Sequence, residues 1–419
     1  MGAYGKCIGR PYVNGFEKMK QIASTQSRSN YLVLPRKQRL QMLLQSIVEV
    51  LFGVYLFYSM LSIQMGIYIP SIAFLLLVAL AGVSVMAWGR RSILVNPIVI
   101  LVSLISSAVV LVQYLFFGVD PGSEEVRAFI TWIPLTMISV GLISREGFIK
   151  RWLVAMFILA LIFWMSITFV HIGASVLRAR ADGTSLSNIN DYAAWVGFCS
   201  LGFWLWGISV DGGKRSQWMF IVSVLAFTML IQTVSRGSLV ALLMGLIVSF
   251  RNISRKYWIQ LLIGLTIFAL VALQFSVFIQ AVSAYDVRLY EETGRSLVWL
   301  AALNLIKTNP WIGYGVKAVG IYIYSRQRNY TPHNGILYLW FTSGLLPLIP
   351  FIVMWFRSLV IAWRNRSVHW IDPLPLLIFV ILEMLTSNSY FMSLWSVMTI
   401  CYVFNMRGQT EKGVPLHDQ

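Results

Sequence analysis

Charged residues are scarce in this sequence, and their scarcity excludes most soluble folds. Only 12% of the 419 residues are Asp, Glu, Lys or Arg, whereas 58% are hydrophobic. That charged fraction is about half the usual value for a soluble domain, so most of the surface is expected to face lipid. Runs of the roughly twenty apolar residues that span a bilayer recur along the chain, separated by short polar links. We therefore expect one all-α bundle of transmembrane helices without a separate soluble domain.

The sequence also lacks the residues that several kinds of chemistry require. Its three cysteines lie far apart, and Cys199 and Cys401 fall inside apolar runs. We therefore interpret them as packing residues, not as disulfide partners or metal ligands. The absence of a GxxxxGK[ST] phosphate-binding loop argues against nucleotide hydrolysis as an energy source. Carboxylates with metal-ligand spacing are missing too, so neither a metal nor another cofactor is expected.

The apolar runs predict twelve transmembrane helices. They cover residues 42–60, 66–88, 95–117, 128–143, 152–171, 192–209, 217–231, 236–250, 257–279, 344–363, 374–386 and 390–406. The helical domain is thus 41–406, between a basic tail over 1–40 and a short tail over 407–419. Both tails are expected in the cytoplasm.

Basic residues in alternate links support this topology, because cytoplasmic links are enriched in Lys and Arg. The links expected inside carry Arg90 and Arg91; Arg145, Lys150 and Arg151; Lys214 and Arg215; Arg251, Arg255 and Lys256; Arg364 and Arg366; and Arg407 and Lys412. The net charge of +17 therefore belongs mainly to links that orient the chain and touch membrane lipid. Binding of nucleic acid is the weaker interpretation.

Several arginines oppose this bias because they fall on the expected outer side. They are Arg178, Arg180, Arg236, Arg288, Arg295, Arg326 and Arg328. Binding of an anionic group by guanidinium contacts would account for them. The simpler alternative, which is favoured for any single arginine, is pairing with lipid phosphates or with nearby carboxylates such as Asp286, Glu291 and Glu292. For the arginines as a group we favour a function.

Residues 281–343 form the only extended link, and long links in compact proteins are usually functional or disordered. An amphipathic helix is predicted after Gly294, ending at Asn309-Pro310. A glycine-containing segment and a tyrosine-rich segment follow, and another apolar helix begins after Pro332-His333-Asn334. The positive end of that helix dipole disfavours an imidazolium and keeps the His333 ring able to accept a proton. A local capping role is the alternative, and for an isolated Pro-His-Asn it is the better one.

Five segments, in this order and spacing, resemble the O-antigen ligase and polymerase family of bacterial polysaccharide assembly. They are Asn188-Ile-Asn190-Asp191-Tyr-Ala-Ala194, Thr233-Val-Ser235-Arg236-Gly237, Gly294-Arg295-Ser-Leu-Val-Trp299, Asn309-Pro310-Trp-Ile-Gly313-Tyr-Gly315, and His333-Asn334 followed by Gly344. They cover the sixth to tenth predicted helices, whereas the first five match only in being apolar.

The resemblance implies a lipid-donor (GT-C-like) glycosyltransferase fold in the bacterial inner membrane, with a periplasmic active site in and around 281–343. The donor would be an undecaprenyl-diphosphate-linked glycan, and no metal or nucleotide would be needed. By position, Arg236 and Arg295 would hold the diphosphate, His333 would activate the acceptor hydroxyl, and Asn334 would orient it. Further substrate contacts would come from Arg178, Arg180 and Arg288.

The acceptor stays open between a lipid-linked repeat, as in polymerases, and lipid A-core, as in ligases. In many ligases a second small or polar residue follows the glycine after two intervening residues, whereas Gly344 is followed by Leu345, Leu346 and Pro347. A polymerase is therefore at least as well supported. A transporter or flippase of lipid-linked or anionic substrates is the alternative class. It is disfavoured because Glu49 and Glu383 are nearly alone within the spans and no internal repeat is visible.

Overall fold

Each predicted span before residue 251 coincides with an α-helix in the computed structural model. The structure describes residues 36–64, 70–89, 97–117, 124–145, 147–170, 189–209, 214–252, 295–314, 321–323, 328–330, 332–364, 371–386 and 398–404. Up to residue 252 the elements are α2 (Arg36–Gln64), α3 (Pro70–Trp88), α5 (Pro97–Phe117), α6 (Glu124–Ile143), α7 (Phe148–Val170), α9 (Ile189–Ser209), α10 (Lys214–Gln232), α11 (Arg236–Ser249) and the 3-10 turn η1 (Phe250–Asn252).

The later elements include the helix that was predicted after Gly294. They are α14 (Arg295–Ile306), β1 (Ile321–Ile323), β2 (Arg328–Tyr330), α15 (Gly335–Ser343), α16 (Leu345–Arg364) and α17 (Pro373–Thr386). The predicted span 257–279 lies outside the described residues, and of the last span residues 398–404 are helical.

Three of these helices contain stretches long and apolar enough to cross a membrane. They are Gln38–Tyr58 in α2, Phe148–Met165 in α7 and Leu345–Arg364 in α16. Large apolar side chains also point outward from the bundle, including Val50, Phe116 and Phe356, each at least 66% exposed. Such exposure is expected of side chains that meet lipid. The chain is therefore a membrane protein, and the count of twelve spans stays a prediction.

A short β-ribbon departs from the all-α prediction. Strands β1 and β2 pair antiparallel, with Ile321 opposite Tyr330 and Ile323 opposite Arg328. Isoleucine and tyrosine favour strands, and pairing satisfies those backbone polar groups of Ile-Tyr-Ile that face β2. The ribbon is a small addition to a fold that is otherwise helical over the described residues, as the sequence predicted.

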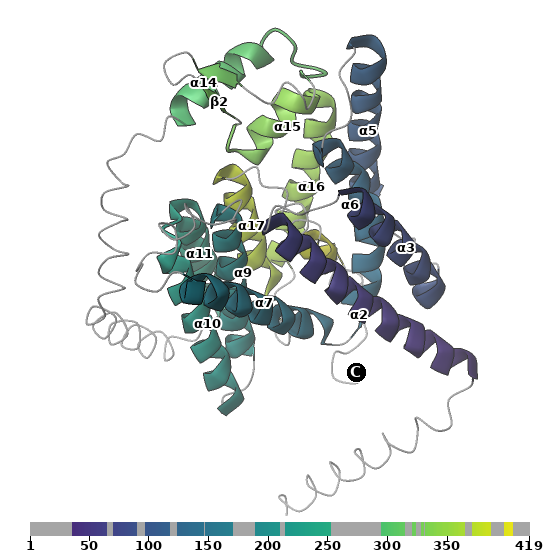
Figure 1. Cartoon of the computed structure of the whole chain (residues 1–419), viewed down its shortest axis with the longest axis vertical. Helices are drawn as coiled ribbons and strands as arrows, with labels where there is room; N and C mark the ends of the chain where they lie inside the picture. The colour runs from purple at the N-terminus through teal and green to yellow at the C-terminus, as the bar shows by residue number, and fades with distance from the viewer. Residues whose placement is uncertain are drawn as a thin grey trace, which may run out of the picture.

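The core is centred on α9, which is buried along nearly its whole length. It packs against α7, α10, α11 and α17 (Figure 1). A helix that is apolar on all sides must be surrounded by other helices. Cys199 of α9 and Cys401 are both buried and free, which confirms their interpretation as packing residues.

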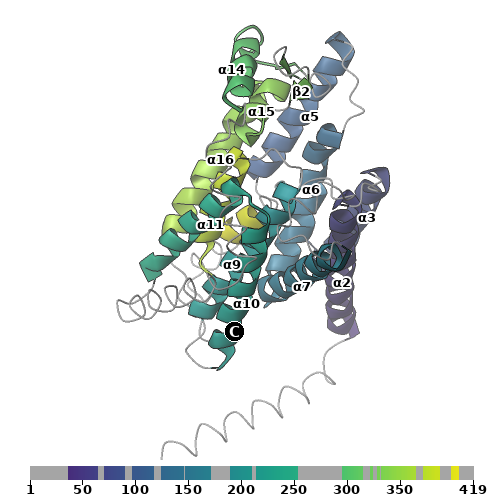
Figure 2. The ribbon, with the colours of Figure 1, turned by 60° about the vertical axis from the view of Figure 1, so that its left-hand side comes forward.

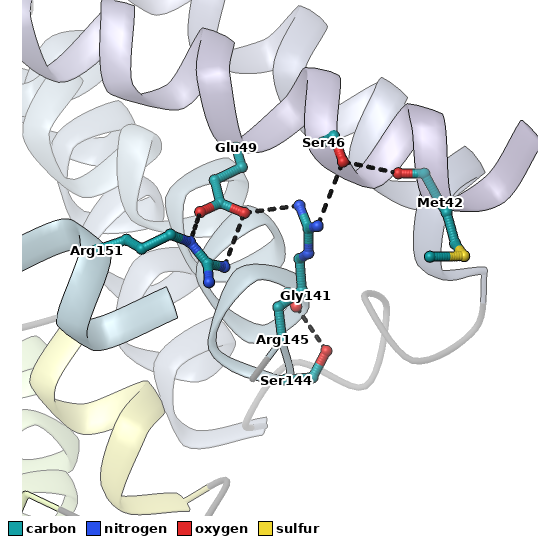
Figure 3. Close-up of polar contacts among 7 residues, drawn as sticks. All are labelled: Met42, Ser46, Glu49, Gly141, Ser144, Arg145 and Arg151. Atoms are coloured by element: carbon teal, nitrogen blue, oxygen red, sulfur yellow. Dashed lines mark hydrogen bonds and ion pairs between the residues drawn. The ribbon is translucent and has the colours of Figure 1, made fainter. Parts of the chain in front are cut away.

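Glu49 joins α2 to the turn between α6 and α7. Its carboxylate accepts from Arg145 Nη1 at 2.6 Å and from Arg151 Nε at 2.5 Å. The Ser46 hydroxyl accepts a further bond from Arg145. Figure 3 shows both guanidinium groups converging on the one carboxylate. The charge of Glu49 is thus paired with two arginines of a link that the sequence predicts on the inner side.

Helices α11 and α17 run antiparallel, which fixes the two ends of the bundle. At one end, a Cβ on Gly237 would lie 2.6 Å from the Thr386 hydroxyl oxygen. At the other end, Arg251 and Asp372 form an ion pair of 2.8 Å. Arg251 also donates to Ala362 O near the end of α16, so Leu345, the first residue of α16, lies at the same end of the bundle as Arg236. Figure 2 shows α14, β2 and α15 gathered at that end.

Candidate functional site

The turn between α10 and α11 is buried and strained. Val234 has a φ of +53°, the only positive φ of a non-glycine residue among the described positions. This conformation is costly for a β-branched residue, and such strain is concentrated at functional sites. The Thr233 hydroxyl donates to the Leu230 carbonyl at 2.7 Å and accepts from the Ser235 amide at 3.3 Å. Arg236, the first residue of α11, is therefore set by a turn with little freedom.

Arg236 occupies the end of a helix at which a cation is disfavoured. Ser235 is the N-cap of α11, but its side chain makes no capping hydrogen bond. The positive end of the helix dipole favours an anion at this position. A guanidinium placed beside it reinforces that preference for an anionic ligand.

A buried polar cluster adjoins this turn and connects three helices. The Ser235 and Ser238 hydroxyl oxygens lie 3.2 Å apart. Ser238 in turn is a hydrogen-bonding neighbour of the Glu383 carboxylate in α17, and the Asp191 carboxylate of α9 lies close enough to act on Glu383 electrostatically. Glu383 is 2% exposed, and its Oε1 atom has no hydrogen-bond partner. The structure thus brings the first turns of α9 and α11 together around Glu383 of α17.

Glu383 was not among the residues that the sequence predicted for the site. The signal that was present is its rarity, since ionisable residues inside membrane helices are often functional. The sequence could not show that Ser238 is its neighbour. These two residues are 145 positions apart and become adjacent only through the packing of α11 against α17.

Helices α14 and α15 form a second unit, here called the α14–α15 block. Val298, Ala302 and Ile306 are buried on one face of α14 and pack with Phe341 of α15. Their spacing of four residues places them on the same side of the helix. Arg295 is the first residue of α14. Contacts of α15 with α16 and α17 place the block at the end of the bundle where α11 begins and α17 ends (Figure 2).

Two glycines allow the backbone of the loop after α14 to pack closely against the backbone between α15 and α16. Gly313 and Gly344 have φ values of +73° and +80°. A Cβ on Gly344 would lie 2.1 Å from the Trp311 carbonyl oxygen, so no other residue fits there without a shift of backbone. The Tyr314 amide donates to Phe341 O and the Leu345 amide to Pro310 O, both at 2.9 Å.

His333 stands directly before α15, as the sequence predicted. Its side chain is exposed. Asn334 is the N-cap, and its side-chain oxygen accepts from the Leu337 amide at 3.0 Å. Asn334 thus caps α15. His333 precedes this cap, at the positive end of the α15 dipole.

The remaining predicted site residues are not placed. Arg178, Arg180 and Arg288 lie outside the described residues. Among the residues that the structure does describe, no group of three or more His, Cys, Asp or Glu side chains could hold a metal ion. The described part of the candidate site thus consists of Arg236 with its polar cluster, together with Arg295, His333 and Asn334 on the α14–α15 block.

Comparison with known proteins identifies the same region. A family model described as O-antigen ligase matches residues 221–352, which run from α10 into α16. This confirms the resemblance that the motifs indicated. A search of curated proteins gives no match.

Proposed function

Because the chain carries an O-antigen ligase family region, we propose that it is a membrane glycosyltransferase that uses a polyprenyl-diphosphate-linked glycan as donor. The acceptor is a hydroxyl group on a lipid-linked repeat or on lipid A-core. The reaction takes place at the periplasmic face of the bacterial inner membrane, with both termini of the chain in the cytoplasm.

One observation carries this proposal. The matched region holds a strained turn that presents Arg236 at the positive end of a helix, and the block bearing Arg295 and His333 lies at the same end of the bundle. Guanidinium groups and helix amides suit a diphosphate, whereas an exposed neutral imidazole suits removal of a proton from a hydroxyl. Transfer from a lipid-diphosphate donor to a hydroxyl acceptor would use the cationic groups on the diphosphate and the imidazole on the hydroxyl.

The proposed step is a single displacement. The acceptor oxygen forms a bond to the anomeric carbon while the bond from that carbon to the diphosphate oxygen breaks, and the electron pair leaves with the lipid diphosphate. His333 takes the hydroxyl proton. Arg236 and Arg295 stabilise the charge that develops on the leaving group, with Arg178, Arg180 and Arg288 as further diphosphate contacts. Attack from the opposite side inverts the anomeric configuration.

Complementation of a deletion strain tests the assignment. His333→Ala and Arg236→Ala should each abolish polymer formation or its surface attachment while the amount of protein in the membrane stays normal. Lys307→Ala is the matched control, because Lys307 is an exposed cation on the same block whose described bond is to Asn304. Normal polymer from both site variants would refute the proposal.

The deletion strain also identifies the acceptor. Long glycan stranded on carrier lipid indicates a ligase, whereas single repeats indicate a polymerase. Conversion of purified donor in the presence of a chelator tests metal independence. Loss of conversion that one divalent ion restores would remove that part of the proposal.

A further inference from the structure

The break between α15 and α16 leaves backbone carbonyl groups that no helix bond satisfies. The last carbonyls of a helix lack intrahelical partners, and irregular backbone at membrane depth must find partners within the protein. The loop after α14 supplies the amide for Phe341 O and accepts the amide of Leu345. The carbonyls of Ile312, in the loop, and Thr342, near the end of α15, accept hydrogen bonds from a side chain and not from backbone amides.

Both of these carbonyls accept from one side chain on a distant helix. Gln113 of α5 donates from its amide nitrogen to Ile312 O at 2.7 Å and to Thr342 O at 2.8 Å. A side-chain amide has two N–H donors, so Gln113 can satisfy both acceptors at once. The residue is 3% exposed. Thr342 lies 229 positions further along the chain.

We propose that Gln113 is a positioning residue for the transfer reaction. It fixes the position of the α14–α15 block, and with it His333, relative to α5. This inference rests on the proposed function of the site. It assigns a role in that site to the first half of the chain, which lies before the region that the family model matches.

The geometry makes Gln113 an effective anchor. One hydrogen bond holds the C-terminal end of α15 and the other holds the loop that returns from α14, so the two elements of the block are tied to α5 at the same point. Helix α15 is nine residues long, about 13 Å, and His333 directly precedes its other end. A tilt of this short helix about its anchored end therefore displaces the imidazole. Misplacement by about 1 Å can slow a reaction by about 100-fold.

Replacement of Gln113 has a matched control on the same helix face. Ser106 lies seven residues earlier on α5, is fully buried, and its hydroxyl has no hydrogen-bond partner. Ser106→Ala therefore changes a buried polar residue to an apolar one without removing a contact. Gln113→Leu removes both donors at similar volume, and Gln113→Glu keeps the shape but places acceptor oxygens against carbonyl oxygens.

Amide hydrogen exchange of the purified protein tests the anchor without any assay of activity. In Gln113→Leu and Gln113→Glu, exchange should accelerate in peptides that cover 310–314 and 341–346, because the amides of Tyr314 and Leu345 lose a fixed partner. Peptides from α9 and α11 should exchange as in the wild type. Unchanged exchange at 310–314 and 341–346 would overturn the inference, and so would acceleration throughout the chain.

Kinetics of transfer test the positioning role. The two Gln113 variants should lower kcat by about 10- to 100-fold with little change in KM for the donor, whereas Ser106→Ala should match the wild type. Local acceleration of exchange with an unchanged kcat would refute positioning. If the wild type itself transfers no glycan, the proposed function fails on its own, and the exchange comparison still decides whether Gln113 anchors the block.

Discussion

Replacement of Gly344 by alanine should be among the most damaging single-methyl changes in this protein. Gly344 separates α15 from α16, with φ +80° and ψ −171°. A new Cβ would lie 2.1 Å from the Trp311 carbonyl oxygen and 2.3 Å from its carbonyl carbon. These are backbone atoms, so relief requires movement of the loop and not a change of side-chain rotamer.

The expected cost is the sum of two contributions. A non-glycine residue in this sparsely populated region costs about 1–3 kcal/mol. Overpacking in a tight site costs about 1–3 kcal/mol more, because a shift of Trp311 also strains the bond from the Leu345 amide to Pro310 O. The free energy of unfolding should therefore fall by about 2–6 kcal/mol.

Two other glycines separate these contributions. Gly89 has a φ of +59° but nothing within 4 Å of an added Cβ, so Gly89→Ala should show the conformational cost alone, about 1–2 kcal/mol. Gly82 lies within α3, also in open space, and Gly82→Ala should be neutral or stabilising by about 0.5–1 kcal/mol.

The assay is the thermal unfolding midpoint of each purified variant in one detergent at one protein concentration. The midpoints should fall in the order Gly82→Ala, wild type, Gly89→Ala, Gly344→Ala. Hydrogen exchange should show that the loss in Gly344→Ala begins at 310–314. A Gly344→Ala midpoint equal to that of Gly89→Ala would show that the close approach of Trp311 is absent, and the reasoning would be wrong.

Two further changes test contacts at opposite ends of the bundle. Asp372→Asn keeps the side-chain oxygen that accepts from the Leu374 amide but removes the charge that faces Arg251. Since the side chains of Asp372 and Arg251 are only 4% and 13% exposed, the free energy of unfolding should fall by about 3–5 kcal/mol. A thermal midpoint unchanged from the wild type would contradict a buried ion pair. Asn334→Ala removes the N-cap of α15 and should cost about 1 kcal/mol, with faster exchange in its first turn, whereas Asn334→Asp should retain the wild-type midpoint.

Local patterns were sufficient to locate the helices that the structure describes. Hydropathy runs coincide with the helices, Asn309-Pro310 follows the end of α14, and His333 directly precedes α15 as expected. These features depend on residues near one another in sequence, because apolar length, proline and capping residues act within a few turns. The resemblance of the motifs is confirmed by the family match over 221–352.

Other features depend on contacts between distant segments and had no local signal. In the sequence Gln113 is one polar residue in an apolar run, whereas in the structure it donates to the carbonyls of Ile312 and Thr342. Glu383 is connected to the candidate site only through its neighbours Ser238 and Asp191, which lie on other helices. The short β-ribbon was missed because three-residue strands are too brief for period-two alternation to be read.

By itself, the sequence determined that this chain enters the membrane, where its helices lie and to which family its central region is related, because hydropathy and motif spacing are properties of the chain alone. Only the tertiary structure decided that Arg236 shares one end of the bundle with the α14–α15 block, and that a glutamine of α5 anchors that block. The reason is physical: a buried carbonyl or carboxylate must find its partner in space, and the antiparallel packing of helices chooses that partner without regard to distance along the chain.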